Sequence, residues 1–176
     1  MGITDALVII STVIFLLLMW GIVGYRHLSH LRREIFGQWE VLDEGLRKRH
    51  DLLPNLIETV RVHASKVELF QKLIDERSLA MREYRPGAKK IEYEHDLSKR
   101  IDEVFSLGSE NGELSKDTGF LELHKEIDDL EQNIEEKSKR YNKMVREYNS
   151  HRKYAILKPL AGVFGFKVAN IFEVEI

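Results

Sequence analysis

The chain has 176 residues, of which 29 are acidic and 27 basic, and its formal net charge is −2. It contains three prolines and no cysteine, which excludes a disulfide scaffold, a thiolate zinc site and a cysteine nucleophile. The small negative charge argues against a nucleic-acid-binding protein, so we expect no nucleic-acid partner.

The first candidate element is an uncharged stretch over residues 6–25, ALVIISTVIFLLLMWGIVGY. A helix of this length rises about 30 Å, which matches the hydrocarbon core of a bilayer. A cleaved signal peptide is the alternative, but such a peptide carries basic residues before its apolar part, and residues 1–5 contain neither Lys nor Arg. We therefore predict a short N-terminal tail over residues 1–5 and one transmembrane helix over residues 6–25.

The flanks of this stretch indicate its orientation. Trp20 and Tyr25 lie toward its C-terminal end, where amphipathic rings favour the headgroup region. Arg26, Arg32 and Arg33 follow closely, and basic residues resist translocation. The sequence thus predicts that these five residues lie at the membrane interface and that the C-terminal domain faces the cytoplasm.

A helical seam follows the apolar stretch, with no helix breaker between the two. Its apolar residues recur at alternating steps of three and four, which is typical of a helix that packs lengthwise against neighbours. The pattern predicts that the membrane helix continues into the first helix of a bundle, with the seam in the bundle core or between subunits. The seam residues are Leu28, Leu31, Ile35, Trp39, Leu42 and Leu46.

Pro54 is the ambiguous position in the chain. Proline lacks an amide hydrogen and disfavours the helical conformation of the residue before it, but the missing hydrogen costs nothing in the first turn of a helix. With Asp51 as N-cap, we expect the chain to reverse here and a second helix to cover residues 52–84. One long kinked helix is the alternative. The side chains expected to face inward are Leu56, Ile57, Val60, Ala64, Val67, Ile74 and Met81.

Turn signals delimit a third helix. The Arg-Pro-Gly sequence at residues 85–87 predicts a turn, because proline fixes one backbone angle and glycine supplies a conformation that other residues avoid. A helix is then expected over residues 90–107. The Gly-Ser-Glu-Asn-Gly sequence at residues 108–112 predicts the loop that ends it.

A fourth and longest helix is predicted after this loop. Asp117 or Thr118 is expected to cap its start, and the apolar periodicity extends to about Tyr154. Four helices joined by short loops favour an antiparallel bundle. The predicted fold class is therefore all-α, with the membrane helix continuing into a four-helix-type bundle over residues 26–157.

The C-terminal tail, residues 158–176, differs sharply in composition from the helices. Its sequence, KPLAGVFGFKVANIFEVEI, has apolar side chains that mostly alternate, which predicts an extended segment. So many apolar side chains are expected to be shielded from water. We consider three arrangements: the tail folds back on its own bundle, lies on the membrane surface, or is exchanged between subunits. The residues expected to make the contact are Phe164, Gly165, Phe166 and Phe172.

Three sequence blocks carry a resemblance to a known family. They are RREIFGQWEVLDEGLRKRHDLLPNLIETV at residues 32–60, RYNKMVREYN at 140–149 and LAGVFGF at 160–166. Together with the single N-terminal span, they resemble the bacterial LemA family. The resemblance implies a membrane-anchored helical bundle in the bacterial inner membrane, with one branch associated with magnetosome membranes, and it supplies no catalytic residue. The motif positions are Arg49, His50, Asp51, Pro54, Asn55, Tyr141, Asn142, Tyr148 and Asn149.

Candidate metal ligands do not complete a recognisable site. Glu92 and His95 have the Glu-x-x-His spacing of di-metal bundles, but such a site needs a second pair and two further glutamates. His27 and His30 share a face just outside the bilayer, where lipid headgroups are the expected contacts. We therefore expect no catalytic residue, no metal site and no cofactor.

Two polar motifs allow more than one interpretation. The basic run at residues 47–50 can bind phosphate or an acidic partner, but we interpret it as a solvated helix end where cations complement the helix dipole. The Tyr-Asn pairs at residues 141–142 and 148–149 are interpreted as packed tyrosines whose hydroxyls form hydrogen bonds at the bundle edge. A binding surface is the alternative for these pairs.

These features lead to a functional hypothesis. The protein is expected to be a single-pass, non-enzymatic scaffold or adaptor that self-associates at the bacterial inner membrane and organises or remodels it. The expected partners are the lipid bilayer, a second copy of the chain and a membrane protein. The alternative is a sensor or binding module for a ligand or a membrane protease, on the outer side of the membrane.

Overall fold

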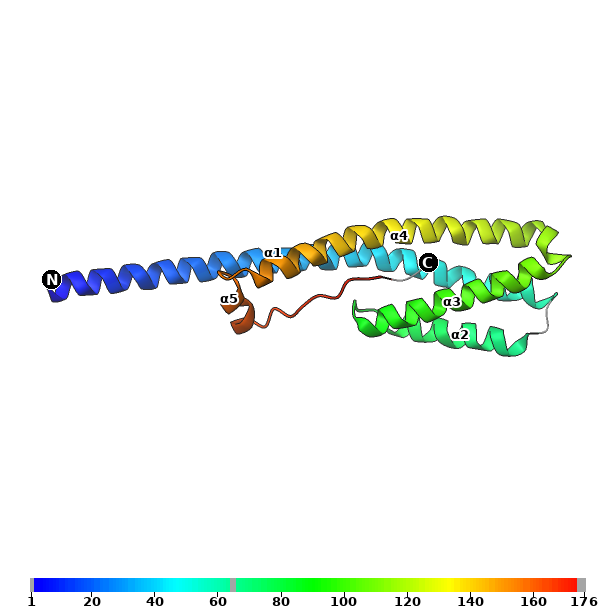
Figure 1. Cartoon of the computed structure of the whole chain (residues 1–176), viewed down its shortest axis with the longest axis horizontal. Coiled ribbons are helices and arrows are strands. Elements are labelled where there is room, and N and C mark those ends of the chain that lie inside the picture. Colours follow the sequence, from blue (N-terminus) through cyan, green and yellow to red (C-terminus); the bar gives the residue numbers. More distant parts are fainter. Residues whose placement is uncertain (1, 64–65, 174–176) are drawn as a thin grey trace. The chain divides into compact units, whose positions relative to one another are not determined.

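The computed structural model describes residues 2–63 and 66–173, and these residues contain helices and connecting segments but no β-strand (Figure 1). The all-α prediction is therefore confirmed. The elements are α1 (Ile3–Arg61), α2 (Val67–Arg82), α3 (Ala88–Glu110), the short 3₁₀ helix η1 (Leu114–Lys116), α4 (Thr118–Lys153) and α5 (Lys158–Val163).

The chain divides into two compact units, each built from two stretches of sequence. Unit 1 comprises residues 1–36 and 144–169, and so contains the first part of α1, the last part of α4 and α5. Unit 2 comprises residues 37–143 and 170–176, and contains the remainder of α1, with α2, α3, η1 and most of α4.

Unit 2 is an antiparallel four-helix bundle. Trp39 of α1 contacts Tyr141 of α4, while further along α1 the backbone of Gly45 lies against Ile134, so the two helices run in opposite directions. The hairpins α2–α3 and α3–α4 reverse the chain in the same way, as the Arg100–Glu76 and Phe105–Phe120 contacts show. This arrangement confirms the predicted bundle.

The apolar core of unit 2 is drawn from all four helices and η1. Burying each large aliphatic or aromatic side chain contributes about 1.5–3 kcal/mol relative to exposure. At the end of α3, the backbone of Gly108 is packed so closely against the Phe120 ring that a Cβ would clash with it. The core residues are Leu53, Leu56, Val60, Phe70, Leu73, Ala80, Leu97, Ile101, Val104, Phe105, Leu114, Phe120, Leu123 and Ile127.

The prediction of a chain reversal at Pro54 is wrong, because α1 passes through this proline and continues to Arg61. Within a helix, Pro54 leaves the carbonyl of His50, four residues earlier, without its usual N–H donor. That carbonyl instead accepts a hydrogen bond from Arg77 Nε of α2 at 2.7 Å. The neighbouring helix thus satisfies the group that the proline leaves unpaired, which lowers the cost of the continuous helix.

The true end of α1 changes which face of the next helix is buried. Leu56 and Val60 are buried as predicted, and Ile57 is partly buried. Val67, Ile74 and Met81 are 73%, 41% and 49% exposed, so their predicted inward orientation is wrong. Because α2 is a separate helix that starts at Val67, it turns a different face, Phe70, Leu73 and Ala80, into the core. The predicted inward position Ala64 lies outside the described residues.

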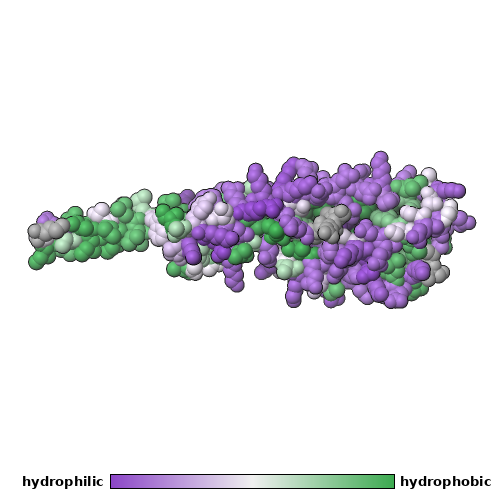
Figure 2. All heavy atoms as spheres, viewed as in Figure 1, coloured by the Kyte–Doolittle hydropathy of each residue, from purple (hydrophilic) through white to green (hydrophobic). Residues whose placement is uncertain are grey.

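The apolar stretch and the seam behave as the periodicity predicts. All six seam side chains, Leu28, Leu31, Ile35, Trp39, Leu42 and Leu46, are at most 8% exposed. Before the seam, α1 carries a segment long and apolar enough to cross a membrane. Figure 2 shows this part of α1 as a mainly hydrophobic surface.

The predicted turns are partly correct. Residues 85–87 lie between α2 and α3 as expected, and Asp117 caps α4 through a 2.8 Å hydrogen bond to the backbone N–H of Phe120. The loop predicted at residues 108–112 starts too early, since α3 continues to Glu110. Gly108 serves close packing against Phe120 and does not end the helix.

The tail is not wholly extended, because residues 158–163 form α5. Gly165 follows this helix with a positive φ of 65°, the left-handed conformation that favours glycine. The Phe166 N–H donates to the carbonyl of Ala161 at 2.9 Å, and the Gly165 N–H donates to that of Gly162 at 3.4 Å. This pair of bonds is a Schellman cap, a role that was not predicted for Gly165. The described residues after the cap, 167–173, are irregular.

Candidate functional site

The centre of the unit 2 bundle holds a cluster of buried charged groups. Arg49 and Glu94 are both 0% exposed and form an ion pair with 2.8 Å between Nη2 and Oε2. Glu94 also lies 3.1 Å from His50 Nε2 and 2.8 Å from Lys90 Nζ. One carboxylate of α3 thus faces three basic side chains. We name this set, Arg49, His50, Lys90 and Glu94, the charge cluster.

The charge cluster extends to the neighbouring helices. Arg49 Nη1 donates to Ser98 Oγ at 2.8 Å and lies 3.6 Å from Glu131 Oε1 of α4. Lys90 Nζ donates to the carbonyl of Ala80 in α2 at 2.8 Å and lies 3.7 Å from Asp43 Oδ1 in α1. The cluster therefore ties all four helices of unit 2 together.

The ionisation of the cluster follows from its surroundings. Burial alone would raise the pKa of Glu94, but the hydrogen bond and charge of His50 and the charges of Arg49 and Lys90 outweigh it and lower the pKa to about 2. Burial raises the pKa of Glu131 despite the charge of Arg49, and Asp102 raises it further. Glu94 is therefore the carboxylate that stays ionised beside Arg49.

Two side-chain nitrogen atoms of the charge cluster stand apart from its hydrogen bonds. Arg49 Nε and His50 Nδ1 are buried and have no hydrogen-bond partner among the described residues. Since Arg49 and His50 are 0% and 1% exposed, these atoms do not reach solvent. The arrangement can hold charge and fix the register of four helices.

The interpretation of residues 47–50 as a solvated helix end is wrong for half of the run. Arg49 and His50 are buried, and the run lies in the middle of α1. Arg47 and Lys48 do face solvent, where they pair with Asp43 and Glu44 at 2.7 Å each, one helical turn earlier. The helical period explains the division, because consecutive residues point to different sides of the helix.

A second site lies where unit 2 holds the end of the tail. The side chain of Asn142 accepts from the backbone N–H of Phe172 at 2.6 Å and donates to its carbonyl at 2.7 Å. Tyr141 donates its hydroxyl to the carbonyl of Asn170 at 3.0 Å. The Phe172 ring packs edge to face against Trp39 at 5.9 Å. We name this arrangement the inner clamp.

Unit 1 contains a matching arrangement, which we name the outer clamp. Asn149 accepts from the backbone N–H of Ala169 at 3.1 Å and donates to its carbonyl at 2.8 Å. Tyr148 donates its hydroxyl to the carbonyl of Lys167 at 2.9 Å. The hydrogen bonds of both clamps go to backbone groups of the tail, and the inner clamp also holds the Phe172 ring.

The other predicted motif positions have varied surroundings. Asp51, Pro54 and Asn55 are exposed or nearly so on α1, and only Pro54 has a structural consequence, through His50 and Arg77. Among the predicted tail contacts, Phe166 and Phe172 are buried, whereas Phe164 is half exposed. The structure thus brings Tyr141, Asn142 and Phe172 together in one site, but it does not include Asp51 or Asn55 in it.

The residues predicted at the membrane interface lie on the unit 1 part of α1. Tyr25 packs against Phe164 and Phe166, with ring centroids 5.0 and 5.7 Å away. Arg32 lies over the ring of Phe36 at 5.8 Å, and Arg26 and Arg33 are exposed. Trp20 is partly buried, and its indole Nε1 has no partner among the described residues. His27 contacts His151 of α4, with Nε2 and Nδ1 2.6 Å apart.

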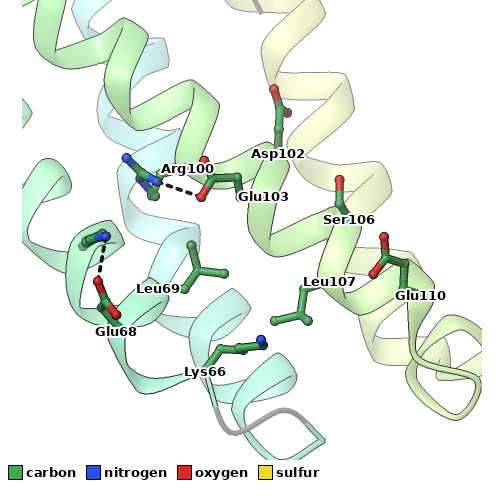
Figure 3. Close-up of a pocket in the computed structure, with 10 residues that line it drawn as sticks. Lys66, Glu68, Leu69, Arg100, Asp102, Glu103, Ser106, Leu107 and Glu110 are labelled. Carbon is green, nitrogen blue, oxygen red and sulfur yellow. Dashed lines mark hydrogen bonds and ion pairs between the residues drawn. The ribbon is translucent and has the colours of Figure 1, made fainter.

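A shallow polar groove runs between α2 and α3 in unit 2 (Figure 3). Basic and acidic side chains both line it, and the Arg100–Glu103 and Lys72–Glu68 ion pairs lie at 2.7 and 2.8 Å. Within the described residues, no group of three or more His, Asp or Glu side chains is placed to hold a metal ion. The groove is lined by Lys66, Glu68, Leu69, Lys72, Arg100, Asp102, Glu103, Ser106, Leu107 and Glu110.

Two of the four members of the charge cluster, Lys90 and Glu94, and its neighbours Ser98 and Glu131 were not singled out from the sequence. Lys90, Ser98 and Glu131 give no signal of their own, because isolated polar residues on a helix are usually solvated. Glu94 and Ser98 do follow a step of four, with Lys90 four residues before Glu94, which places the three on one face of α3. That polar line lies beside the apolar positions Leu97 and Ile101 and was the only available sign of burial.

The fold and these sites define a class: an antiparallel helical bundle whose first helix begins with an apolar stretch, and whose C-terminal tail is held by Tyr-Asn clamps. The LemA family model matches residues 38–176, and the chain belongs to the LemA family. The match includes the bundle, both clamps and the tail, and it starts after the apolar stretch. No curated protein matches the chain. Family membership and the apolar N-terminal helix fit a membrane-associated protein.

Proposed function

We propose that this protein is a non-enzymatic scaffold or adaptor that is anchored in the bacterial inner membrane and self-associates there. The observation that carries the proposal is the exposed apolar stripe of α2, formed by Val67, Ile74 and Met81. These residues recur every seven positions, so they share one face of the helix. An apolar face at this spacing is suited to packing against another helix.

A second copy of α2 fits this stripe by symmetry. In an antiparallel pair centred on Ile74, each Ile74 meets its equivalent, and Val67 of each copy meets Met81 of the other, because both lie seven residues from the centre. Such a two-fold interface uses the same patch on both subunits. The stripe adjoins the buried face of α2, formed by Phe70, Leu73 and Ala80, and consists of side chains that the bundle leaves exposed.

The anchoring part of the proposal is supported by α1. This single helix starts with the segment that can cross a membrane and ends within the bundle, so whatever anchors its N-terminal part also tethers unit 2. The cytoplasmic side is supported by Arg26, Arg32 and Arg33, which follow the apolar stretch closely. A non-enzymatic role is supported by the burial of the charge cluster, whose ion pairs join the helices of the bundle.

The test is the mass of the full-length protein in mild detergent, measured by light scattering over a range of concentrations. We expect an assembly larger than one chain, and we expect Ile74→Asp to reduce it to the monomer because the charge would be buried at the interface. Leu121→Asp is the matched control, since Leu121 is a 48% exposed apolar residue on α4. A wild-type protein that is monomeric at every concentration would contradict self-association.

The groove between α2 and α3 favours a second candidate function, a sensor or binding module for a ligand or a membrane protease. Its paired charges and the two leucines Leu69 and Leu107 offer mixed polar and apolar contacts. The same candidate allows the bundle to lie outside the cytoplasm. Ser109→Cys, labelled in intact cells with an impermeant thiol reagent, distinguishes the two sides, because the native sequence contains no cysteine. Labelling without cell lysis would contradict the cytoplasmic orientation.

A further inference from the structure

The part of unit 1 that follows the apolar stretch is strongly basic. Residues 26–36 and 144–169 contain eight Lys or Arg residues and two Asp or Glu residues. The stretches that form unit 2 contain 19 basic and 26 acidic residues. The excess of positive charge in unit 1 is thus opposed by an excess of negative charge in the bundle, which the overall net charge of −2 conceals. The basic residues are Arg26, Arg32, Arg33, Arg146, Arg152, Lys153, Lys158 and Lys167.

Most of this charge comes from the far end of the sequence, and a specific contact joins α5 to the end of the apolar stretch. The side chains of Leu157 and Leu160 lie so close to the backbone of Gly24 that a Cβ there would clash with Leu160. Next to it, the Tyr25 ring packs against Phe164 and Phe166. Leu160 and Ala161 are buried by this packing. Helix α5 is therefore docked on α1 at the level where the apolar stretch ends.

The outer side of this docked segment is apolar and exposed. Ile156, Val163 and Phe164 are 63%, 80% and 50% exposed, while the neighbouring residues Lys153 and Lys158 are also exposed. A segment with apolar side chains and lysines close together is suited to a membrane surface, where the lysine ammonium groups reach the headgroups and the apolar groups enter the boundary region. Clustered basic residues beside a membrane span attract anionic lipids.

We propose that residues 153–164 form a second membrane contact, which rests on an anionic phospholipid surface beside the α1 span. The inference rests on the anchoring part of the proposed function and adds to it the place of contact and the lipid class. Continuity with the apolar stretch fixes the depth of the segment, and the excess of basic residues selects anionic headgroups. Membrane attachment then involves both ends of the sequence.

The experiment uses full-length protein with Val163→Cys, labelled with an environment-sensitive fluorophore and reconstituted into vesicles. One set of vesicles contains phosphatidylcholine alone, and the other contains phosphatidylcholine with phosphatidylglycerol. Both carry a lipid with a nitroxide quencher near the headgroup. We expect quenching of the label at residue 163 to be at least twofold stronger with phosphatidylglycerol. Ser109→Cys, in the last turn of α3 in unit 2, is the control site and should show no quenching in either set.

Charge reversal at two exposed lysines tests the electrostatic part. In the Val163→Cys background, Lys153→Glu with Lys158→Glu should lower the quenching in phosphatidylglycerol vesicles to the value in phosphatidylcholine. Lys99→Glu with Lys125→Glu, which reverses two exposed lysines of unit 2, should leave it unchanged. Near-UV spectra of the variants check that the fold is retained.

The outcomes separate this inference from the proposed function. Flotation with the vesicles reports whether the chain is anchored, and light scattering reports self-association, so failure of either is recognised independently. If the protein floats with the vesicles but residue 163 is not quenched in phosphatidylglycerol, the second membrane contact is overturned. Equal quenching in both lipid compositions overturns the choice of an anionic surface.

Discussion

The inner and outer clamps use the same two residue types in very different surroundings. In the inner clamp, Asn142 is buried, its bonds to Phe172 are 2.6 and 2.7 Å long, and the Phe172 ring is 2% exposed beside Trp39. In the outer clamp, Asn149 is partly exposed, and its bonds of 2.8 and 3.1 Å reach Ala169, whose side chain is a single methyl group.

The difference indicates that the asparagine hydrogen bonds set the register of the tail, whereas the buried aromatic ring supplies most of its binding energy. The asparagine bonds are made to backbone groups in both clamps, so they select a register but discriminate little between sequences. The buried aromatic ring is present in the inner clamp alone and supplies apolar burial, which is the larger contribution. The inner clamp should hold the tail more tightly, and both should depend on the bundle that carries them.

The largest effect is expected from breaking the charge cluster in the bundle that carries the inner clamp. Glu94→Gln leaves three buried basic side chains without their common counter-charge, which should lower the free energy of unfolding by about 3–5 kcal/mol. Urea unfolding of the full chain in detergent, followed by circular dichroism, measures it. Glu103→Gln is the control on the same helix, because Glu103 is 51% exposed where it pairs with Arg100. It should change the free energy of unfolding by about 1 kcal/mol or less.

Removing the apolar anchor should affect the inner clamp next most strongly. Phe172→Ala is expected to cost about 3 kcal/mol, or roughly a 100-fold faster amide exchange of the tail around residue 172. Hydrogen-exchange mass spectrometry of the C-terminal peptide detects this change. Val168→Ala, at a 58% exposed position, should leave exchange almost unchanged. Comparable effects of the two substitutions would contradict an anchor at Phe172.

Lowering the pH should reduce the stabilisation that Glu94 gives to the folded protein. The pKa of Glu94 is lowered to about 2 in the folded protein from its ordinary 4.5, so its ionised form stabilises the fold above pH 4.5. This stabilisation, roughly 3 kcal/mol from the shift in pKa, is lost as the pH falls from 4.5 to 2. The difference in unfolding free energy between wild type and Glu94→Gln should therefore shrink over this range. A difference that stays constant down to pH 2 would show that Glu94 does not titrate as proposed.

The two asparagines allow the clamps to be compared directly. Asn142→Ala removes two hydrogen bonds in a buried setting and leaves the N–H and carbonyl of Phe172 unpaired, which should cost about 2–3 kcal/mol. Asn149→Ala removes the same bonds in a partly exposed setting, where water can replace them, and should cost about 1 kcal/mol. Exchange protection of residues 169 and 172 in each variant gives the comparison. An equal loss in the two variants would mean that burial does not distinguish the clamps.

The smallest effect is expected at the tyrosine hydroxyls. Tyr141→Phe and Tyr148→Phe each remove one hydrogen bond and should cost about 1 kcal/mol. Burial raises the pKa of Tyr141 to about 12 and also raises that of Tyr148. Because the fold favours the neutral phenol, stability should be constant below pH 10 and fall between pH 10 and 12. Absorbance of tyrosinate, compared between wild type and the two variants, should place the Tyr141 titration at the high end of this range.

The Tyr-Asn pairs show which part of the clamps could be predicted from the sequence. Their seven-residue spacing on α4 was visible, and seven helical residues rise about 10.5 Å, close to the length of three extended residues at about 3.3 Å each. The tail acceptors Lys167 and Asn170 are three residues apart, as are Ala169 and Phe172. The spacing of the pairs was therefore readable, but their partners were not, because backbone acceptors leave no mark in a sequence.

Sequence by itself determined the features that depend on local pattern: the apolar stretch, the seam, the helical class, the turn at residues 85–87 and the capping by Asp117. Tertiary structure alone decided the course of the chain at Pro54, the exposed face of α2 and the burial of Arg49 and His50. The first and third depend on a group from another helix, the Arg77 donor for the His50 carbonyl and the Glu94 carboxylate for the buried cations. The second depends on which side of α2 packs against the rest of the bundle. A local sequence pattern does not specify any of these long-range contacts.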